Sequence, residues 1–223
     1  MRRASLPRTL ALIALAAAIP LLASCRSAPG AAPAAAVSLY RAGDYVIYEY
    51  TGALLDAPVK LEEEILEQEG LRLTIDVVAT RNDERREWIQ VVTDTPENQR
   101  NNVVDELYEV QNGQRVRLEN ADNADLLRLY EWTEPPKGGP LAPPVQEPRK
   151  VEGPTGKVTA YCAVGSWMVE NRPAHFEYCA SNEFLWTHLS MRLIDAATGK
   201  ALYEMRAVES GRRAPRPSMP QAP

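Results

Sequence analysis

Apolar and polar residues alternate with a period of two along much of the chain. In residues 71–80, for example, apolar Leu73 and Ile75 flank polar Thr74. Successive side chains of a strand point to opposite faces, so the pattern predicts a strand with one face in a core and the other largely in water. The preceding run, 59–65, alternates in the same way. The two runs together predict an antiparallel hairpin.

The same alternation predicts a series of further short strands. We expect them at residues 45–50, 86–92, 103–110, 114–118, 158–162, 167–169, 174–179, 184–194 and 201–208. One short helix is predicted at 124–132, where Leu126 and Leu129 are apolar and Asp122 or Asn123 can cap the first turn. The chain is therefore predicted to be mainly β, an antiparallel sandwich or open barrel of about ten strands with one short helix.

The Asn112 and Gly113 pair marks a hairpin turn. A two-residue loop would pair Tyr108 with Arg117, whereas a three-residue loop pairs Tyr108 with Val116. The three-residue loop collects the apolar residues on one face and gives Gly113 the left-handed bulge position, so it is the register we predict.

Proline and glycine divide the rest of the chain. Residues 134–156 are rich in both and have no period, which predicts a long loop between two groups of strands. Residues 158–208 alone would form a small sheet with an uncovered face, so we expect a single β domain over 39–210. Residues 211–223 are Pro-rich and carry three arginines. They predict a disordered tail, which could contact a polyanion weakly.

The N-terminal residues have the pattern of a secretory signal. Three arginines in the first nine residues precede an apolar run at 10–22, which is too short to span a bilayer. Residues 22–25 read Leu-Ala-Ser-Cys, and this sequence resembles the lipobox of bacterial lipoproteins. The resemblance implies that residues 1–24 are removed and that Cys25 becomes a lipid-modified membrane anchor.

The residues after Cys25 refine the expected location. Residue 26 is arginine rather than aspartate, and in Gram-negative lipoproteins this resemblance implies sorting to the outer membrane, facing the periplasm or the surface. Residues 25–38 are predicted to form the lipidated cysteine and a flexible tether, because small residues and prolines bury too little surface to fold. A Pro-stiffened tether of this length extends up to about 40 Å.

Net charge limits the classes of partner. The chain carries −5 at pH 7, and cleavage at Cys25 would remove three arginines and no acids. An acidic surface repels phosphate backbones and anionic headgroups, so we expect no nucleic-acid partner and expect membrane attachment through the lipid anchor alone.

Cys162 and Cys179 form an even pair once Cys25 is lipidated. The envelope oxidises thiols, so a disulfide is predicted. A metal or redox pair is the alternative, but the spacing is far from CxxC.

Candidate catalytic and metal-binding residues are few. His175 and His188 would need to be cross-strand neighbours, with Glu177 or Glu183 added, to hold a metal. Ser166 lacks the second glycine of a nucleophile elbow. We therefore expect no catalytic residue, metal or cofactor.

Two polar clusters, 94–99 and 120–125, offer oxygen ligands suited to calcium. Neither has the spacing of a calcium loop, and the same residue types serve turns and helix caps, which is the interpretation we favour.

Four tryptophans and nine tyrosines supply large amphipathic rings. Most are expected to fill the core, and some could line a cavity for an apolar ligand. The prediction is a non-enzymatic envelope lipoprotein that presents a β domain to a protein or a lipid-like ligand. The alternatives are a structural subunit of an envelope assembly and a hydrolase of envelope polymers.

We expect the mature protein to begin at an acylated Cys25. Intact-mass spectrometry of protein extracted from its own envelope should give the mass of residues 25–223 plus lipid. A chain that retains its initiator end would contradict the prediction, and a free thiol at Cys25 would indicate an ordinary cleaved signal.

Overall fold

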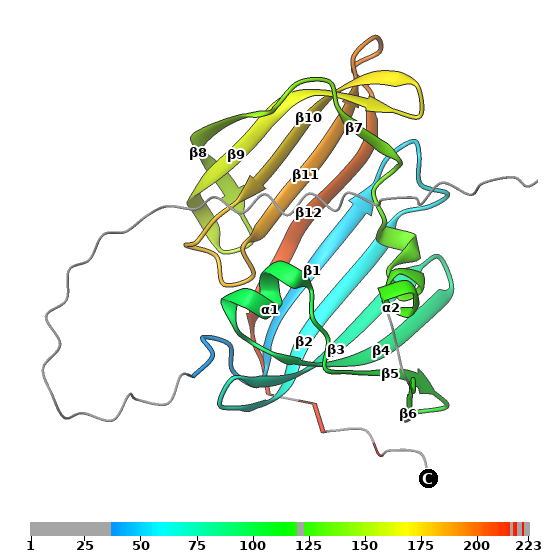
Figure 1. Cartoon of the computed structure of the whole chain (residues 1–223), viewed down its shortest axis with the longest axis vertical. Helices are drawn as coiled ribbons and strands as arrows, with labels where there is room; N and C mark the ends of the chain where they lie inside the picture. The colour runs from blue at the N-terminus through cyan, green and yellow to red at the C-terminus, as the bar shows by residue number, and fades with distance from the viewer. Residues whose placement is uncertain (1–36, 120–122, 215, 218–219, 221–223) are drawn as a thin grey trace, which may run out of the picture.

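Twelve strands form one open antiparallel sheet in the computed structural model (Figure 1). The structure describes residues 37–119, 123–214, 216–217 and 220, so the predicted signal, Cys25 and most of the tether lie outside the described residues. The prediction of a mainly β protein is confirmed. None of the helices among these residues has the length and apolarity needed to cross a membrane.

The elements run in chain order with two short helices inserted after the fourth and sixth strands. They are β1 (Asp44–Thr51), β2 (Val59–Glu69), β3 (Arg72–Arg81), β4 (Glu84–Thr93), α1 (Pro96–Asn101), β5 (Glu106–Gln111), β6 (Gln114–Arg117), α2 (Asn123–Leu129), the 3-10 helix η1 (Glu131–Thr133), β7 (Gly138–Pro140), β8 (Val145–Gly153), β9 (Gly156–Val169), β10 (Arg172–Ala180), β11 (His188–Asp195) and β12 (Ala201–Arg212). The predicted helix at 124–132 corresponds to α2 and η1. Helix α1 was not predicted.

The first and last strands meet in the middle of the sheet. β1 pairs with β2 on one side and with β12 on the other, both antiparallel. From there β2 to β6 extend the sheet in one direction, and β11 to β7 extend it in the other. The two predicted groups of strands therefore share one sheet.

The prediction of a long loop at 134–156 is wrong, because this segment contains β7 and β8. Both pair antiparallel with the outer edge of β9. β8 is mostly exposed on both faces, so it has no apolar period. Its Pro148 is tolerated because an edge strand has a row of backbone groups without a ladder partner. Strand β9 is also continuous across Gly165, where two separate strands were predicted.

The register predicted for the Asn112 turn is also wrong. Tyr108 pairs with Arg117, which leaves a two-residue loop. Asn112 and Gly113 have φ of 53° and 75°, and two successive positive φ values define the type I′ turn, whose twist matches that of the strands it joins. Arg115 lies 5.7 Å from the centre of the Tyr108 ring, so a cation replaces the apolar neighbour that was expected.

Helix α2 and η1 are fixed over one face of the sheet, which we call the helix face. Trp132 is buried, with the guanidinium carbons of Arg81 and Arg86 4.4 and 4.0 Å from its ring centre. The hydroxyl of Tyr203 donates to the carbonyl of Thr133 at 2.8 Å. These contacts tie the α2 segment to β3, β4 and β12, and the segment contributes Leu129 and Trp132 to the main core.

Cys162 and Cys179 form the predicted disulfide. They stand directly opposite each other in β9 and β10, 17 residues apart in sequence, and both are fully buried. The bond joins β9, which carries the edge strands β7 and β8, to the next strand inward.

Replacing both cysteines (Cys162→Ala with Cys179→Ala) should lower the free energy of unfolding by about 2–3 kcal/mol, because the unfolded chain regains the entropy of an open loop. Chemical denaturation of the exported protein measures this. Reductant should shift the wild-type curve by a similar amount and leave the double variant unmoved. Equal stability of the two proteins would contradict the prediction.

Candidate functional site

A pocket of about 450 Å³ lies between α1 and α2, above β4 on the helix face. Most of its wall surface is apolar, with Val92 from the sheet and Leu126 and Leu127 from α2, whereas the α1 side is lined by polar residues. Gln90 and Tyr130 contribute the polar groups nearest the sheet. An apolar cavity with a few placed polar groups is the usual form of a small-molecule site.

The α1 wall of the pocket is built by polar capping. Thr95 accepts a hydrogen bond from the backbone of Asn98 at 3.1 Å, Pro96 occupies the first turn, and Asn102 ends the helix in the left-handed region. Helix α1 buries none of its own residues. The cluster at 94–99 therefore serves a helix cap, as the favoured interpretation held.

The rim of the pocket is apolar and partly exposed. Val103 is 40% exposed and Leu127 is 38% exposed, and both line the pocket. Large apolar side chains at an opening keep part of their surface in water until something covers it. The opening therefore suits a ligand with an apolar portion.

A chain of hydrogen bonds runs from the pocket floor to Glu63, which does not itself line the pocket. The amide of Gln90 donates to the Tyr130 hydroxyl at 2.9 Å, and that hydroxyl donates to Glu63 at 3.3 Å. The Tyr130 ring also packs edge-on against Trp88, with the ring centres 5.0 Å apart. Glu63 thus has its hydrogen-bond donor from the α2 segment, 67 residues away in sequence.

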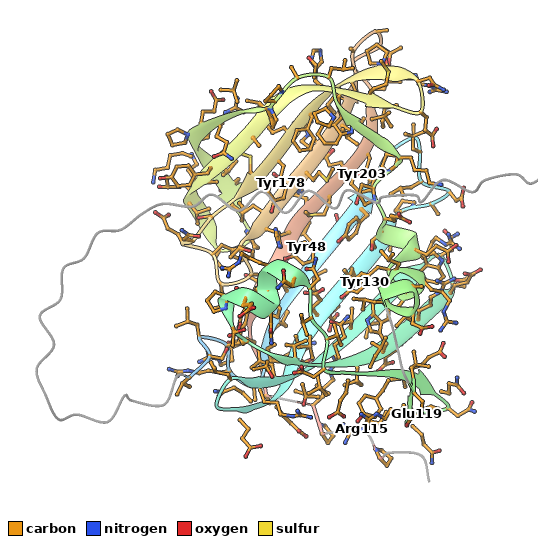
Figure 2. All side chains as sticks on the ribbon, in the orientation of Figure 1. Tyr48, Arg115, Glu119, Tyr130, Tyr178 and Tyr203 are labelled. Atoms are coloured by element: carbon orange, nitrogen blue, oxygen red, sulfur yellow. A yellow bond between two sulfur atoms is a disulfide. The ribbon has the colours of Figure 1, made fainter. Side chains whose placement is uncertain are left out.

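Glu63 is a half-buried carboxyl among tyrosines. Burial raises its pKa to about 7, although the hydrogen bond from Tyr130 lowers it. Burial also raises the pKa of Tyr48, Tyr50 and Tyr130 well above the usual value, and the charge of Glu63 adds to each of these shifts. The tyrosines therefore stay neutral at physiological pH. Tyr48 and Tyr130 lie on the helix face (Figure 2).

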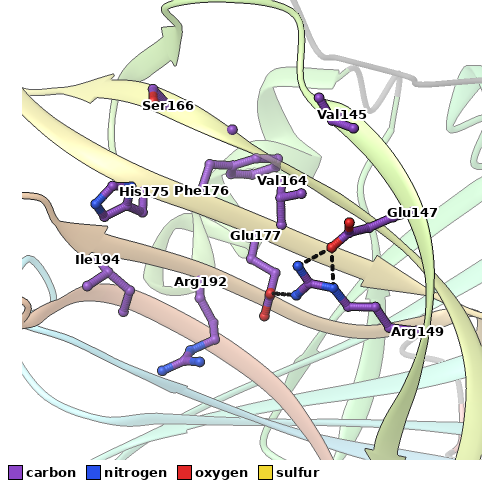
Figure 3. Close-up of a pocket in the computed structure, with 11 residues that line it drawn as sticks. Val145, Glu147, Arg149, Val164, Ser166, His175, Phe176, Glu177, Arg192 and Ile194 are labelled. Carbon is purple, nitrogen blue, oxygen red and sulfur yellow. Dashed lines mark hydrogen bonds and ion pairs between the residues drawn. The ribbon is translucent and has the colours of Figure 1, made fainter.

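A second pocket, of about 570 Å³, lies over β8 to β11 (Figure 3). Arg149 bridges Glu147 and Glu177 there. Ser166 stands opposite His175 in the β9–β10 ladder and both line this pocket, but no hydrogen bond joins their side chains among the described residues. Glu177 is engaged by arginine instead, so these residues do not form the relay that acyl-transfer chemistry requires.

The two histidines are not brought together. His175 pairs with Ile194, whereas His188 pairs with Ala180 at the far end of β10 and shares a hydrogen bond with the Tyr178 hydroxyl. Burial lowers the pKa of His188. The part of the chain that the structure describes contains no group of three His, Cys, Asp or Glu side chains placed to hold a metal, and Asn120 and Asp122 of the second oxygen cluster lie outside it.

The boundary predicted for a disordered tail is wrong at its start. Strand β12 continues through Gly211 to Arg212, because β1 extends alongside it and Asp44 pairs with Arg212. Arg213 and Arg216 also have defined contacts, with carboxylates of the sheet.

The fold and the pocket define the class of protein. It is an open antiparallel β-sheet protein with a pocket between two short helices. No protein-family model and no curated protein matches the chain. Among solved structures, the hypothetical protein CT021 from Chlamydia trachomatis is similar over 82% of this chain and 93% of its own length, at 15% identity and a TM-score of 0.44.

Glu63 was missed by the sequence interpretation, although a signal was present. Leu61 and Ile65 are inward positions of β2, so the period of two also turns Glu63 inward. A charged residue at an inward position marks a candidate site. Its partner Tyr130 could not be found in this way, because no local pattern links residues so far apart.

Replacing Glu63 by glutamine should make stability less dependent on pH. The folded wild-type protein holds the Glu63 proton up to about pH 7, whereas the unfolded chain releases it near 4.5. Wild type should therefore lose roughly 1–3 kcal/mol relative to Glu63→Gln as the pH rises from about 4.5 to 8. Urea unfolding at several pH values measures the difference.

Glu49→Gln is the matched control, since Glu49 is exposed on the neighbouring strand. Its curve should follow the wild-type curve. Parallel curves for wild type and Glu63→Gln would show that Glu63 titrates normally.

Proposed function

We propose that the protein is a lipid-anchored envelope protein that binds a small amphipathic ligand between α1 and α2. The lipobox resemblance at Cys25 supports the anchor and the location. The apolar pocket with an exposed apolar rim supports the ligand class, and it is the observation on which the proposal rests.

The size of the pocket suits a small molecule. About 450 Å³ lies within the range of ligand sites, and the walls supply apolar surface from both β4 and α2. Covering the rim residues Val103 and Leu127 would remove exposed apolar surface from water, which contributes roughly 25 cal/mol for each Å².

The floor suits a polar but uncharged head group. Gln90 and Tyr130 offer hydrogen-bonding groups beneath the pocket, and no ion pair of Glu63 is found among the described residues. Ionised phosphate or carboxylate would lie close to an acidic side chain without a cation to balance it. A hydroxyl or amide head group would instead hydrogen-bond at no electrostatic cost.

The anchor and the pocket are consistent with one role. A tether that extends up to about 40 Å would let the pocket sample the membrane surface and the space next to it. Binding an apolar molecule there would shield it from water, which is a task that needs no catalytic residue.

Leu127→Asp should weaken binding of an apolar probe at least about tenfold, because the substitution places a charge at the pocket rim. The measurement is a fluorescence titration with N-phenyl-1-naphthylamine, an uncharged dye that brightens in apolar surroundings. The parent is the mature chain with Cys25→Ser and without residues 1–24, so that neither lipid, detergent nor the apolar run at 10–22 competes for the dye.

Leu141→Asp is the matched control, since Leu141 is 55% exposed and lies outside the pocket. Its affinity should equal that of the parent. Absence of dye binding by the parent, or equal loss in both aspartate variants, would refute the pocket as the ligand site.

A further inference from the structure

Three carboxylates line the face of the sheet opposite the helix face, which we call the back face. Glu62 and Glu64 alternate with Glu63 along β2, and Glu64 stands directly opposite Asp76 of β3. Glu64 is 0% exposed and Asp76 is 1% exposed. Two neighbouring carboxylates buried in this way require cations beside them.

Arg213 supplies the first cation. Its Nε lies 3.0 Å from Glu64, and its Nη2 contacts both Glu62 and Glu64. The guanidinium carbon also lies 4.5 Å from the centre of the Tyr45 ring. Two carboxylates beside an aromatic face form a site shaped for guanidinium, which stacks on rings and bonds carboxylates through several N–H groups.

Arg216 supplies the second cation, three residues further on. Its Nε lies 2.6 Å from Glu64, and its Nη2 lies 2.9 Å from Asp76 Oδ2. Burial raises the pKa of Asp76 to about 7, with Glu87 adding to the rise and Arg216 opposing it. Asp76 Oδ1 has no hydrogen-bond donor among the described residues, so this site keeps spare acceptor capacity.

The C-terminal segment crosses the strands instead of joining the sheet. It leaves β12 at Arg212, contacts β2 and β3 through the two arginines, and its Pro220 carbonyl accepts from the backbone of Arg115 in β6 at 3.1 Å. Among the described residues, it contacts β2 and β3 through ion pairs of the two arginine side chains and through one hydrogen bond, which the Arg216 backbone donates to Glu64 at 3.4 Å. A segment held mainly by side-chain ion pairs can exchange for another that carries the same groups.

We infer that the back-face site formed by Glu62, Glu64, Asp76 and the Tyr45 ring recognises an extended peptide with two arginines three residues apart, presented by another envelope protein. The C-terminal segment of this chain occupies the site through its own two arginines. Charge complementarity supports this choice of partner, since the site offers three carboxylates and an aromatic ring to two guanidinium groups. A competing peptide would displace the segment and expose the site to the partner.

The test uses a fluorescent peptide with the sequence of residues 211–223. Its target is the full-length chain with Arg213→Ala and Arg216→Ala, in which the two arginines no longer occupy the back-face site. We expect this variant to bind the peptide at least about tenfold more tightly than wild type, as measured by fluorescence anisotropy. Binding should weaken as salt rises.

Two controls test whether the peptide binds at the back-face site. A peptide with alanine in place of the arginines at 213 and 216 should not bind, and adding Glu64→Gln to the emptied variant should remove most of the affinity. Circular dichroism checks the fold. If the double variant does not fold, Arg216→Ala alone keeps Arg213 on Glu64 and allows the same comparison with wild type.

Three results would overturn the inference. One is equal affinity of wild type and the emptied variant for the peptide, and another is binding that is insensitive to Glu64→Gln. The third is that light scattering shows a wild-type dimer, which the arginine substitutions abolish. This would show that the back-face site receives the segment of a second copy of the chain.

Discussion

Pairing between β1 and β12 is the interaction on which the rest of the structure depends. Each end of the folded chain contributes one of these strands, and each strand begins a series of hairpins that extends away from the pair. The pairing joins the two halves into one sheet. It also delivers the C-terminal arginines to the back of β2 and requires the chain to cross from β6 to β7, and this crossing places α2 over the helix face (Figure 1).

The run Glu62, Glu63 and Glu64 shows how strand geometry separates like charges. Alternation turns Glu63 toward the helix face and its two neighbours toward the back face. The two faces then offset the cost of burying a carboxylate charge in different ways. Burial among tyrosines raises the pKa of Glu63 to about 7. Burial also opposes ionisation of Glu64, but hydrogen bonds from Arg213 and Arg216 bring its pKa below the usual value.

Sequence patterns predicted the strands whose residues alternate between apolar and polar types. Strand β3 was predicted because Leu73 and Val77 alternate with more polar residues. The prediction that its other face lies largely in water is wrong, because Asp76 and its neighbours on that face are buried. Strand β8 was not predicted, because both of its faces are mostly exposed and its sequence shows no alternation of apolar and polar residues. Helix α1 was not predicted, because it buries none of its residues. The residues that mark its start, Thr95 and Pro96, are equally common in turns.

The candidate site was less predictable than the fold, since its groups meet across long separations in sequence. Gln90, Tyr130 and Glu63 come from β4, the end of α2 and β2, and local periodicity carries no information about which strands become neighbours. The disulfide was the exception, because compartment and an even cysteine count restrict the pairing to one choice. A contact can be predicted from sequence when a residue has only one possible partner. It cannot be predicted when the partner depends on which strands become neighbours in the sheet.

The two faces of β2 therefore have opposite electrostatic environments. On the helix face, desolvation disfavours charge, so apolar burial and neutral hydrogen bonds dominate, and these interactions are nearly independent of ionic strength. On the back face, fixed carboxylates meet guanidinium groups that are 35% and 37% exposed at the side chain, so screening weakens the contact as salt rises. The period of two thus keeps a desolvated environment and a charged environment apart within one strand.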